Sequence, residues 1–295
     1  MRLVVSLGEA GAPSTADVDA RRRVAADLAA SLTAPLIDSL VVVHAGGDAA
    51  GEPNVAGSGT DGGLGHLLDE ELTKAAPHQP VATLPAQVVV DLGPSDDLPS
   101  VSPQGRHRPV GLVEMATLRR LVTAGATVVV SGAAPVSVDL GGRLRRIHAT
   151  VDGDAVAALV AEAVGADLLL LATDVPAVVV DWRTRQARAV RRAGSGHLRD
   201  LVLDSDTMGA KVAAACRFVD ATGHEAAIGA VHDLIDVVEG RSGTRVLGRS
   251  HPLTFYGRRP DCCATADADR VAPAASAAAA ASPGGTDGHP VAVAS

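Results

Sequence analysis

The chain has 295 residues, of which 47% are hydrophobic and 20% are charged, and this balance excludes both a disordered polyelectrolyte and a membrane-embedded protein. Asp and Glu outnumber Lys and Arg by 34 to 26, which gives a net charge of -8, and only 1% of the residues are aromatic. A nucleic-acid-binding protein needs a basic face or aromatic stacking platforms, so this class is not expected. The basic residues are almost all arginines, since Lys74 and Lys211 are the only lysines.

The cysteines are Cys216, Cys262 and Cys263, an odd number that fits neither a disulfide framework nor the spacing of zinc ligands. This pattern favours a reducing compartment, and we expect a cytoplasmic protein. The first apolar run is too short for a signal peptide and meets an acidic residue at once. The longest apolar stretch, residues 168–180, is interrupted by Asp174 and falls short of the roughly 20 residues of a spanning helix, so no membrane segment is expected.

Short β-branched apolar runs alternate with segments of helical period along most of the chain. The runs predict strands at residues 3–7, 40–43, 88–91, 127–131, 167–172, 177–180, 226–229 and 244–247. The periodic segments predict helices at residues 17–31, 64–75, 113–124, 154–164, 209–220 and 231–239. Gly125 and Gly165 follow two of these helices, where a left-handed helix end is favourable. The alternation predicts an α/β fold, a three-layer αβα sandwich around a mainly parallel open sheet, over residues 1–250.

From residue 251 the alternation stops, and the chain becomes rich in Ala, Ser, Pro and Gly. A segment with so few large apolar side chains cannot bury enough surface to offset the entropy of ordering it. Residues 251–295 are therefore predicted to form a disordered tail.

Ligands of open parallel sheets bind at the carboxyl ends of the strands, and small residues follow three of the predicted strands there. The first strand is followed by Gly8, the second by a loop that contains Gly46, and the strand near residue 130 by Gly132. Turns of this kind let backbone amides approach a phosphate closely. Each glycine alone is better explained by a tight corner, so the prediction depends on the three occurring together.

Acidic residues stand at two further element ends. Thr173 and Asp174 end a predicted strand, and Asp152 and Asp154 open a predicted helix. Carboxylates at such positions can hold a metal-bound nucleotide or orient a lysine. For Asp152 and Asp154 helix capping is an equally good explanation, whereas Asp174 has no following helix to cap.

Lys211 stands in the first turn of the helix predicted at residues 209–220, where a cation opposes the helix dipole. This placement indicates that Lys211 faces an anion, such as a phosphoryl group in transfer, together with the amide donors of the helix end. The alternative is a solvated surface lysine. Lys74 lies late in its helix, where a cation suits the dipole, and we expect it to be an ordinary surface residue.

The segments at residues 152–154, 166–175, 207–219 and 226–229 resemble, in this order, the carboxyl half of carbamate kinases. Residues 81–88 and 108–110 resemble the same family, so that the resemblance covers roughly residues 1–248. Carbamate kinases belong to the amino-acid kinase superfamily, whose members are open αβα sandwiches, typically dimeric and cytoplasmic. The resemblance implies a homodimer in arginine metabolism that moves a phosphoryl group reversibly between MgATP and the small molecule carbamate, giving carbamoyl phosphate and MgADP.

The resemblance also implies roles for individual residues. Catalytic roles are implied for Lys211, Asp154 and Gly8, with Lys211 bridging the nucleotide phosphates and the transferring group. The residues implied to bind the nucleotide are Lys211, Thr173, Asp174, Met208 and Gly209. Those implied to bind the substrate are Gly8, Gly46 and Gly132. The cofactors implied are ATP or ADP with Mg²⁺, and we expect no separate metal site made of protein side chains.

The chain departs from the family pattern around the phosphate loops. The first loop normally reads Gly-Gly-Asn, whereas here Glu9 puts a carboxylate beside an anionic substrate. The family's Asp-Lys-Asp motif has Gly153 in place of its lysine. Residues 92–106 are too few for the protruding subdomain that covers the family's active site, so we expect this lid to be deleted. Candidates for supplying the lost charge are Arg143, Arg145 and Arg146.

Two functions from different classes stay open. One is an active phosphotransferase in which Lys211 stabilises the transition state. The other is a catalytically inactive relative that keeps nucleotide binding in a regulatory or binding role, and for it Gly153→Lys alone is not expected to generate turnover. A kinase acting on an amino-acid carboxylate is a third hypothesis, for which the sequence shows no separate carboxylate-binding feature.

Overall fold

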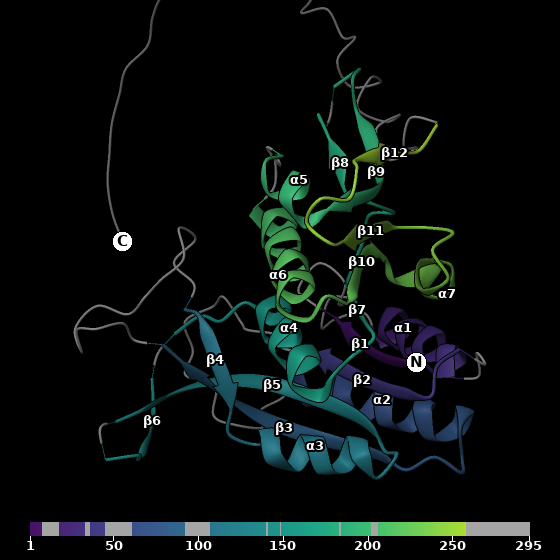
Figure 1. The fold of residues 1–295 in the computed structure, drawn as a ribbon. Helices are drawn as coiled ribbons and strands as arrows, with labels where there is room; N and C mark the ends of the chain where they lie inside the picture. Colours follow the sequence, from purple (N-terminus) through teal and green to yellow (C-terminus); the bar gives the residue numbers. More distant parts are fainter. Residues whose placement is uncertain are drawn as a thin grey trace, which may run out of the picture.

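The computed structural model describes residues 1–7, 18–32, 36–44, 61–91, 107–139, 141–147, 149–182, 184–201 and 206–257. At the centre of this described part, six strands run parallel in the order β10-β7-β1-β2-β5-β3 (Figure 1). They are β1 (Arg2–Ser6), β2 (Ser39–His44), β3 (Val81–Val90), β5 (Thr127–Val138), β7 (Leu168–Thr173) and β10 (Glu225–Ala230). Strands β1, β2 and β7 are almost entirely buried runs of apolar residues, as expected for parallel strands covered on both faces.

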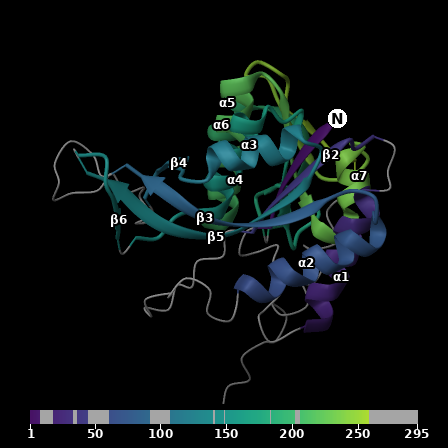
Figure 2. The ribbon, with the colours of Figure 1, turned by 90° about the horizontal axis from the view of Figure 1, so that it is seen from below.

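Shorter strands extend the sheet at both edges. At one edge lie, after β10, the strands β11 (Thr244–Leu247), β9 (Arg188–Gly194), β12 (Thr254–Phe255) and β8 (Val179–Val180). At the other edge β4 (Pro109–Leu112) pairs antiparallel with β3, and β6 (Leu144–Arg146) pairs antiparallel with β5. The part formed by β3, β4, β5 and β6 projects beyond the helices (Figure 2).

Helices cover both faces of the sheet (Figure 2). One face carries α3 (Met115–Thr123), α4 (Gly153–Val164), α5 (Ser195–Arg199) and α6 (Asp206–Thr222). The other face carries α1 (Val18–Leu32), α2 (Asp61–Ala75) and α7 (Leu234–Val238), with the short 3-10 turn η1 (Val231–Asp233) before α7. This arrangement confirms the predicted αβα sandwich around a mainly parallel sheet. None of the described helices is long and apolar enough to cross a membrane.

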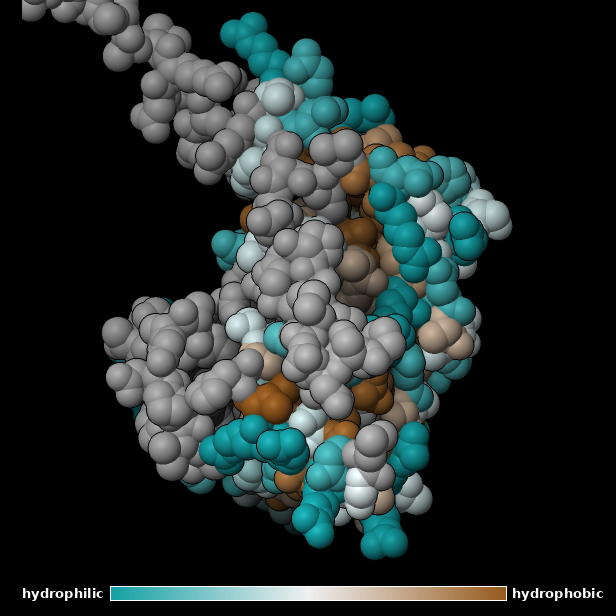
Figure 3. Space-filling model, turned by 90° about the vertical axis from the view of Figure 1, so that its left-hand side faces the viewer, coloured by the Kyte–Doolittle hydropathy of each residue, from teal (hydrophilic) through white to brown (hydrophobic). Residues whose placement is uncertain are grey.

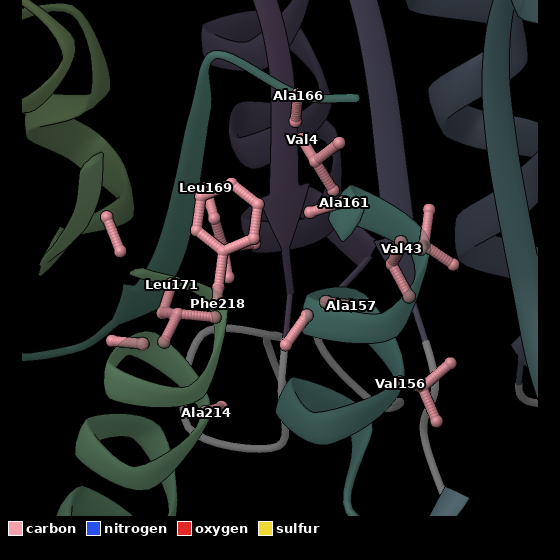
Figure 4. Packing of buried hydrophobic residues seen from close by; sticks show 14 of the residues in the cluster. Val4, Val43, Val156, Ala157, Ala161, Ala166, Leu169, Leu171, Ala214 and Phe218 are labelled. Atoms are coloured by element: carbon pink, nitrogen blue, oxygen red, sulfur yellow. The ribbon is translucent and has the colours of Figure 1, made fainter. Parts of the chain in front are cut away.

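Two buried clusters fill the spaces between the layers. Alternate residues of β1 point into the two clusters. Leu3 and Val5 pack with α1, α2 and α7, whereas Val4 packs with α4 and α6. In the cluster that contains Val4, the ring of Phe218 on α6 lies against Leu169 of β7 (Figure 4). This packing holds α4 and α6 side by side on one face of the sheet.

Strands β3 and β5 are longer than the sequence predicts. Strand β5 continues beyond its predicted end because Gly132, with a φ of 73°, changes the backbone direction without ending the strand. Strand β3 begins at Val81, and its register against β5 shifts between Pro85 and Gln87. Gly132 therefore lies inside a strand, and the expectation that it forms a turn at the strand end is wrong.

Strand β9 has no counterpart among the predicted elements. Residues 188–194 include three arginines. Because of these charged residues, the sequence does not show the apolar run by which the other strands were predicted, although the strand contains buried positions. The described part of the chain ends at residue 257 and includes β12, within the segment assigned to the tail. The rest of that tail, and residues 92–106 with the deleted lid, lie outside the described residues and stay predictions.

Candidate active site

Polar side chains gather at the carboxyl ends of the central strands, although the strands themselves are apolar. Ser6 ends β1, His44 ends β2 and Thr173 ends β7, and their exposures are 1%, 5% and 2%. Burying polar groups costs free energy unless they find partners, so this edge of the sheet is the candidate site. Figure 3 shows one face of the molecule, on which hydrophobic surface of described residues (brown) lies beside hydrophilic surface (teal).

The N-terminus of α4 reaches this edge and is capped by Asp152. The Asp152 side chain accepts hydrogen bonds from the backbone N–H groups of Asp154, at 2.8 Å, and Ala155, at 3.1 Å. At the other end of α4, Gly165 adopts the left-handed conformation predicted for it, with a φ of 66°. Capping is therefore the role of Asp152, whereas Asp154 lies in the first turn with its side chain directed to Ser6.

Ser6, Asp154 and Lys211 form one buried cluster. The Lys211 ammonium donates to Asp154 Oδ2 at 2.9 Å, and the Ser6 hydroxyl donates to Asp154 Oδ1 at 2.7 Å. The Lys211 and Asp154 side chains are 2% and 8% exposed. Among the described residues, Asp154 accepts the side-chain hydrogen bond of Lys211, whose ammonium carries three donor protons.

Burial raises the pKa of the Asp154 carboxyl above its usual value, because a carboxylate loses solvation in the core. The charge of Lys211 opposes this rise, and the nearby Asp152 carboxylate adds to it. The hydrogen bonds from Ser6 and Lys211 lower the pKa of Asp154 again, without reversing the direction. The ionised form of Asp154 thus depends on these two donors rather than on water.

The setting of Lys211 differs from the one expected. Helix α6 begins at Asp206 instead of residue 209, so Lys211 lies in the second turn and the helix dipole is not what explains its position. The surface alternative is wrong, because the side chain is buried against Asp154. The other lysine, Lys74, is 58% exposed and pairs with Glu70 and Glu71, as expected for a surface residue.

Thr173 and Asp174 lie one strand away from the cluster. Ser6 pairs in register with Leu171 of β7, which places Thr173, two residues further on, at the same edge of the sheet. The Thr173 hydroxyl donates to Asp174 Oδ1 at 3.1 Å, and Asp174 is exposed. The two residues are therefore placed where a ligand that contacts Lys211 could also reach them.

The remaining expected residues divide into two groups. Met208 and Gly209 lie half-buried in the first turn of α6, just before Lys211. Gly8 and Gly46 lie outside the described residues. Their assignment to substrate binding stays a prediction, as does that of Gly132, whose place inside β5 differs from the turn expected.

The three arginines considered as replacements for the lost lysine are not brought to the cluster. They are exposed on the hairpin of β5 and β6, and Figures 1 and 2 agree in placing β6 at the outer end of the projecting part, away from α4. The residues concerned are Arg143, Arg145 and Arg146.

Ser6 is the site residue that the sequence analysis missed. Its signal was present, since a polar residue stands where the alternation of β1 calls for an apolar one on the face that packs against α4. A strand residue of this kind needs a partner, and only the fold shows that the partner is Asp154.

Comparison with known proteins agrees with this architecture. A model of the amino acid kinase family matches residues 1–230. The curated carbamate kinases of Haemophilus influenzae and Rhizobium meliloti are 29% and 28% identical, over 87% and 88% of this chain and 100% and 97% of those proteins. A solved carbamate kinase from Giardia lamblia bound to AMP-PNP shares the fold, with a TM-score of 0.70 at 20% identity, over 84% of this chain and 98% of that chain. The chain therefore belongs to the amino acid kinase family, in which it is a divergent relative of the carbamate kinases.

Proposed function

We propose that the protein is a carbamate kinase that transfers a phosphoryl group reversibly between MgATP and carbamate, giving carbamoyl phosphate and MgADP. The observation that carries this proposal is the buried Lys211 ammonium, held by Asp154 at the carboxyl edge of a parallel sheet. The choice of carbamate as the acceptor is supported by the curated relatives. They are carbamate kinases, and this chain matches them over nearly the whole of their length. These relatives give no support to the catalytically inactive alternative.

Phosphoryl transfer needs little covalent chemistry from the protein and depends on placing charge around the transferring group. In the direction of ATP synthesis, the bond between phosphorus and the carbamoyl oxygen breaks, and a bond forms between phosphorus and a terminal oxygen of ADP. The charge of the phosphoryl oxygens needs a cation that is in place before the reaction. Lys211 suits this need, because its ammonium is held by Asp154 at the carboxyl edge of the sheet.

The nucleotide and its magnesium ion are substrates in this proposal. Within the described ranges no group of three or more His, Cys, Asp or Glu side chains could hold a metal ion. An Mg²⁺ ion that arrives on the nucleotide keeps phosphate and water ligands and takes only one or two carboxylates from the protein. Asp174, exposed beside Thr173, is the carboxylate that suits this role, and Met208 and Gly209 would lie along the nucleotide.

The first test is ATP formation from MgADP and carbamoyl phosphate by the purified protein. Lys211→Met is expected to lower the rate at least about 100-fold, because one well-placed donor to a developing charge contributes about that much. Lys74→Met is the matched control, since it removes the other lysine from an exposed helix position and should leave the rate unchanged.

Thermal unfolding of the three proteins separates a lost function from a lost fold. A folded wild-type protein that forms no ATP would contradict the proposed function, and so would a Lys211→Met variant as active as the wild type. The expected homodimer and the cytoplasmic location stay predictions, to be checked by sedimentation and by cell fractionation.

A further inference from the structure

Ser6 occupies a strand position that packing alone would give to an apolar residue. The side chains of Leu3 and Val5 in β1, and of Leu7 just after it, face the cluster around α1, whereas Val4 faces the cluster around α4. Ser6 follows Val4 by two residues, so it shares the α4 face, and it is 1% exposed. Its hydroxyl is therefore buried on a face that packs against mainly apolar side chains, and its hydrogen bond goes to the carboxylate that also holds the Lys211 ammonium.

The two oxygens of Asp154 have different donors. Oδ1 accepts from the Ser6 hydroxyl on β1, and Oδ2 accepts from the Lys211 ammonium on α6. A carboxylate bound at one oxygen only can rotate about its last side-chain torsion, whereas donors at both oxygens fix its plane. The Ser6 bond thus determines where Oδ2 lies, and Oδ2 determines where the ammonium lies.

We propose that Ser6 is a positioning residue for phosphoryl transfer, whose hydroxyl fixes the Asp154 carboxylate so that the Lys211 ammonium is held in place for the transferring group. This proposal rests on the proposed function. Ser6 has no contact with the substrate in it and acts through Asp154 alone.

Within the part of the chain that the structure describes, the charged groups that face Asp154 come from two elements. Lys211 approaches from α6, and Asp152 lies on α4 itself, at the helix cap. Among the described residues that act on the Asp154 carboxyl, Ser6, on β1, is the neutral donor. Removing a donor to the charged form raises a carboxyl pKa, so the loss of the Ser6 hydroxyl would make Asp154 protonate at higher pH and release its hold on Lys211.

The kinetic test compares three substitutions of Ser6. Ser6→Ala is expected to lower kcat for ATP formation about 10- to 100-fold, the size of effect that misplacing a catalytic group produces, with a smaller change in KM. The acidic limb of its kcat profile should move to higher pH. Ser6→Cys, close in volume but a weak donor, should behave like Ser6→Ala, and Ser6→Thr, which keeps the hydroxyl, should recover much of kcat. Ser39→Ala, on the neighbouring strand β2, is the matched control and should leave kcat unchanged.

A second measurement does not depend on catalysis. Ser6 stabilises the ionised carboxylate of Asp154, so the fall in melting temperature caused by Ser6→Ala should be larger at pH 8 than at pH 4. Any change in melting temperature caused by Ser39→Ala should not depend on pH. If the wild type forms no ATP but this pH trend is found, the proposed function fails and the link from Ser6 to Asp154 stands. An active wild type whose kcat and pH profile are unchanged in Ser6→Ala would overturn the positioning role.

Discussion

Lys211 and Asp154 form an ion pair inside the protein rather than on its surface. Taking both charges out of water costs several kcal/mol, and their attraction recovers this only with good geometry and further hydrogen bonds, here including the one from Ser6. A pair of apolar side chains of similar volume would usually be at least as stable at this position. Stability alone therefore does not explain the pair, which agrees with the role proposed for Lys211.

Replacing Lys211 by Met is expected to destabilise the folded protein in a pH-dependent way. Without the ammonium, the pKa of Asp154 rises further, and a carboxyl pKa that is higher in the folded than in the unfolded state makes stability fall as pH rises. The free energy of unfolding should drop by up to about 3–5 kcal/mol near neutral pH. The loss should largely vanish below the unfolded-state pKa of about 3.9, where Asp154 is neutral in both states.

Urea unfolding of Lys211→Met and of the wild type across this pH range measures the effect. The exposed Lys74→Met variant should show no comparable trend, because its ammonium lies in water. A Lys211→Met loss that is the same at every pH would show that Asp154 does not carry the uncompensated charge.

Helix α4 combines a stabilising cap with the placement of the Asp154 carboxylate. It is capped at one end by Asp152 and closed at the other by Gly165 in a left-handed conformation. The closing glycine was predicted from the sequence, whereas capping was only one of two equally good explanations for Asp152. The cap also fixes the first turn, and with it the backbone from which Asp154 reaches Ser6 and Lys211.

Asp152→Ala should lower the free energy of unfolding by about 1 kcal/mol, because two backbone N–H groups at the start of α4 lose their acceptor. Asp152→Asn keeps a capping oxygen and should cost only a few tenths of that. Denaturant unfolding of both variants checks this. Equal losses in the two would show that the charge of Asp152, and not its capping oxygen, stabilises the helix.

On the scale of the whole molecule, the αβα layers place α6 across the sheet with its inner face fully buried. Cys216 lies on this face, is 0% exposed, and is the free cysteine of the described part of the chain. Burial raises the pKa of the Cys216 thiol to about 11. The charge of Arg199 lowers this pKa by a smaller amount, and the charge of Asp220 raises it. Its thiolate is therefore scarce at neutral pH, and the thiol is reached only when the core opens.

Cys216 is expected to react with iodoacetamide at pH 8 at least about 100-fold more slowly than a free thiol of pKa about 8.5. Peptide mapping by mass spectrometry follows this cysteine separately from the other two. Denaturant should restore the full rate. Rapid labelling of Cys216 in the native protein would mean that α6 separates from the sheet far more easily than its buried face implies.

The sequence by itself determined the layers of this protein and the glycine that closes α4, and it singled out Asp152 and Lys211 as candidates. These depend on local patterns, namely the alternation of apolar runs, a capping carboxylate with a closing glycine, and a rare residue type. Only the tertiary structure decided the chemistry of the site. The partners Ser6, Asp154 and Lys211 are far apart in the chain, and they meet because parallel strands end at one edge and α4 and α6 pack on one face. The tertiary structure also decided that Lys211 is buried, that β5 continues through Gly132 and that the arginines of β6 lie away from the site. Burial and strand register depend on neighbours that are distant in the sequence, so a local pattern does not predict them.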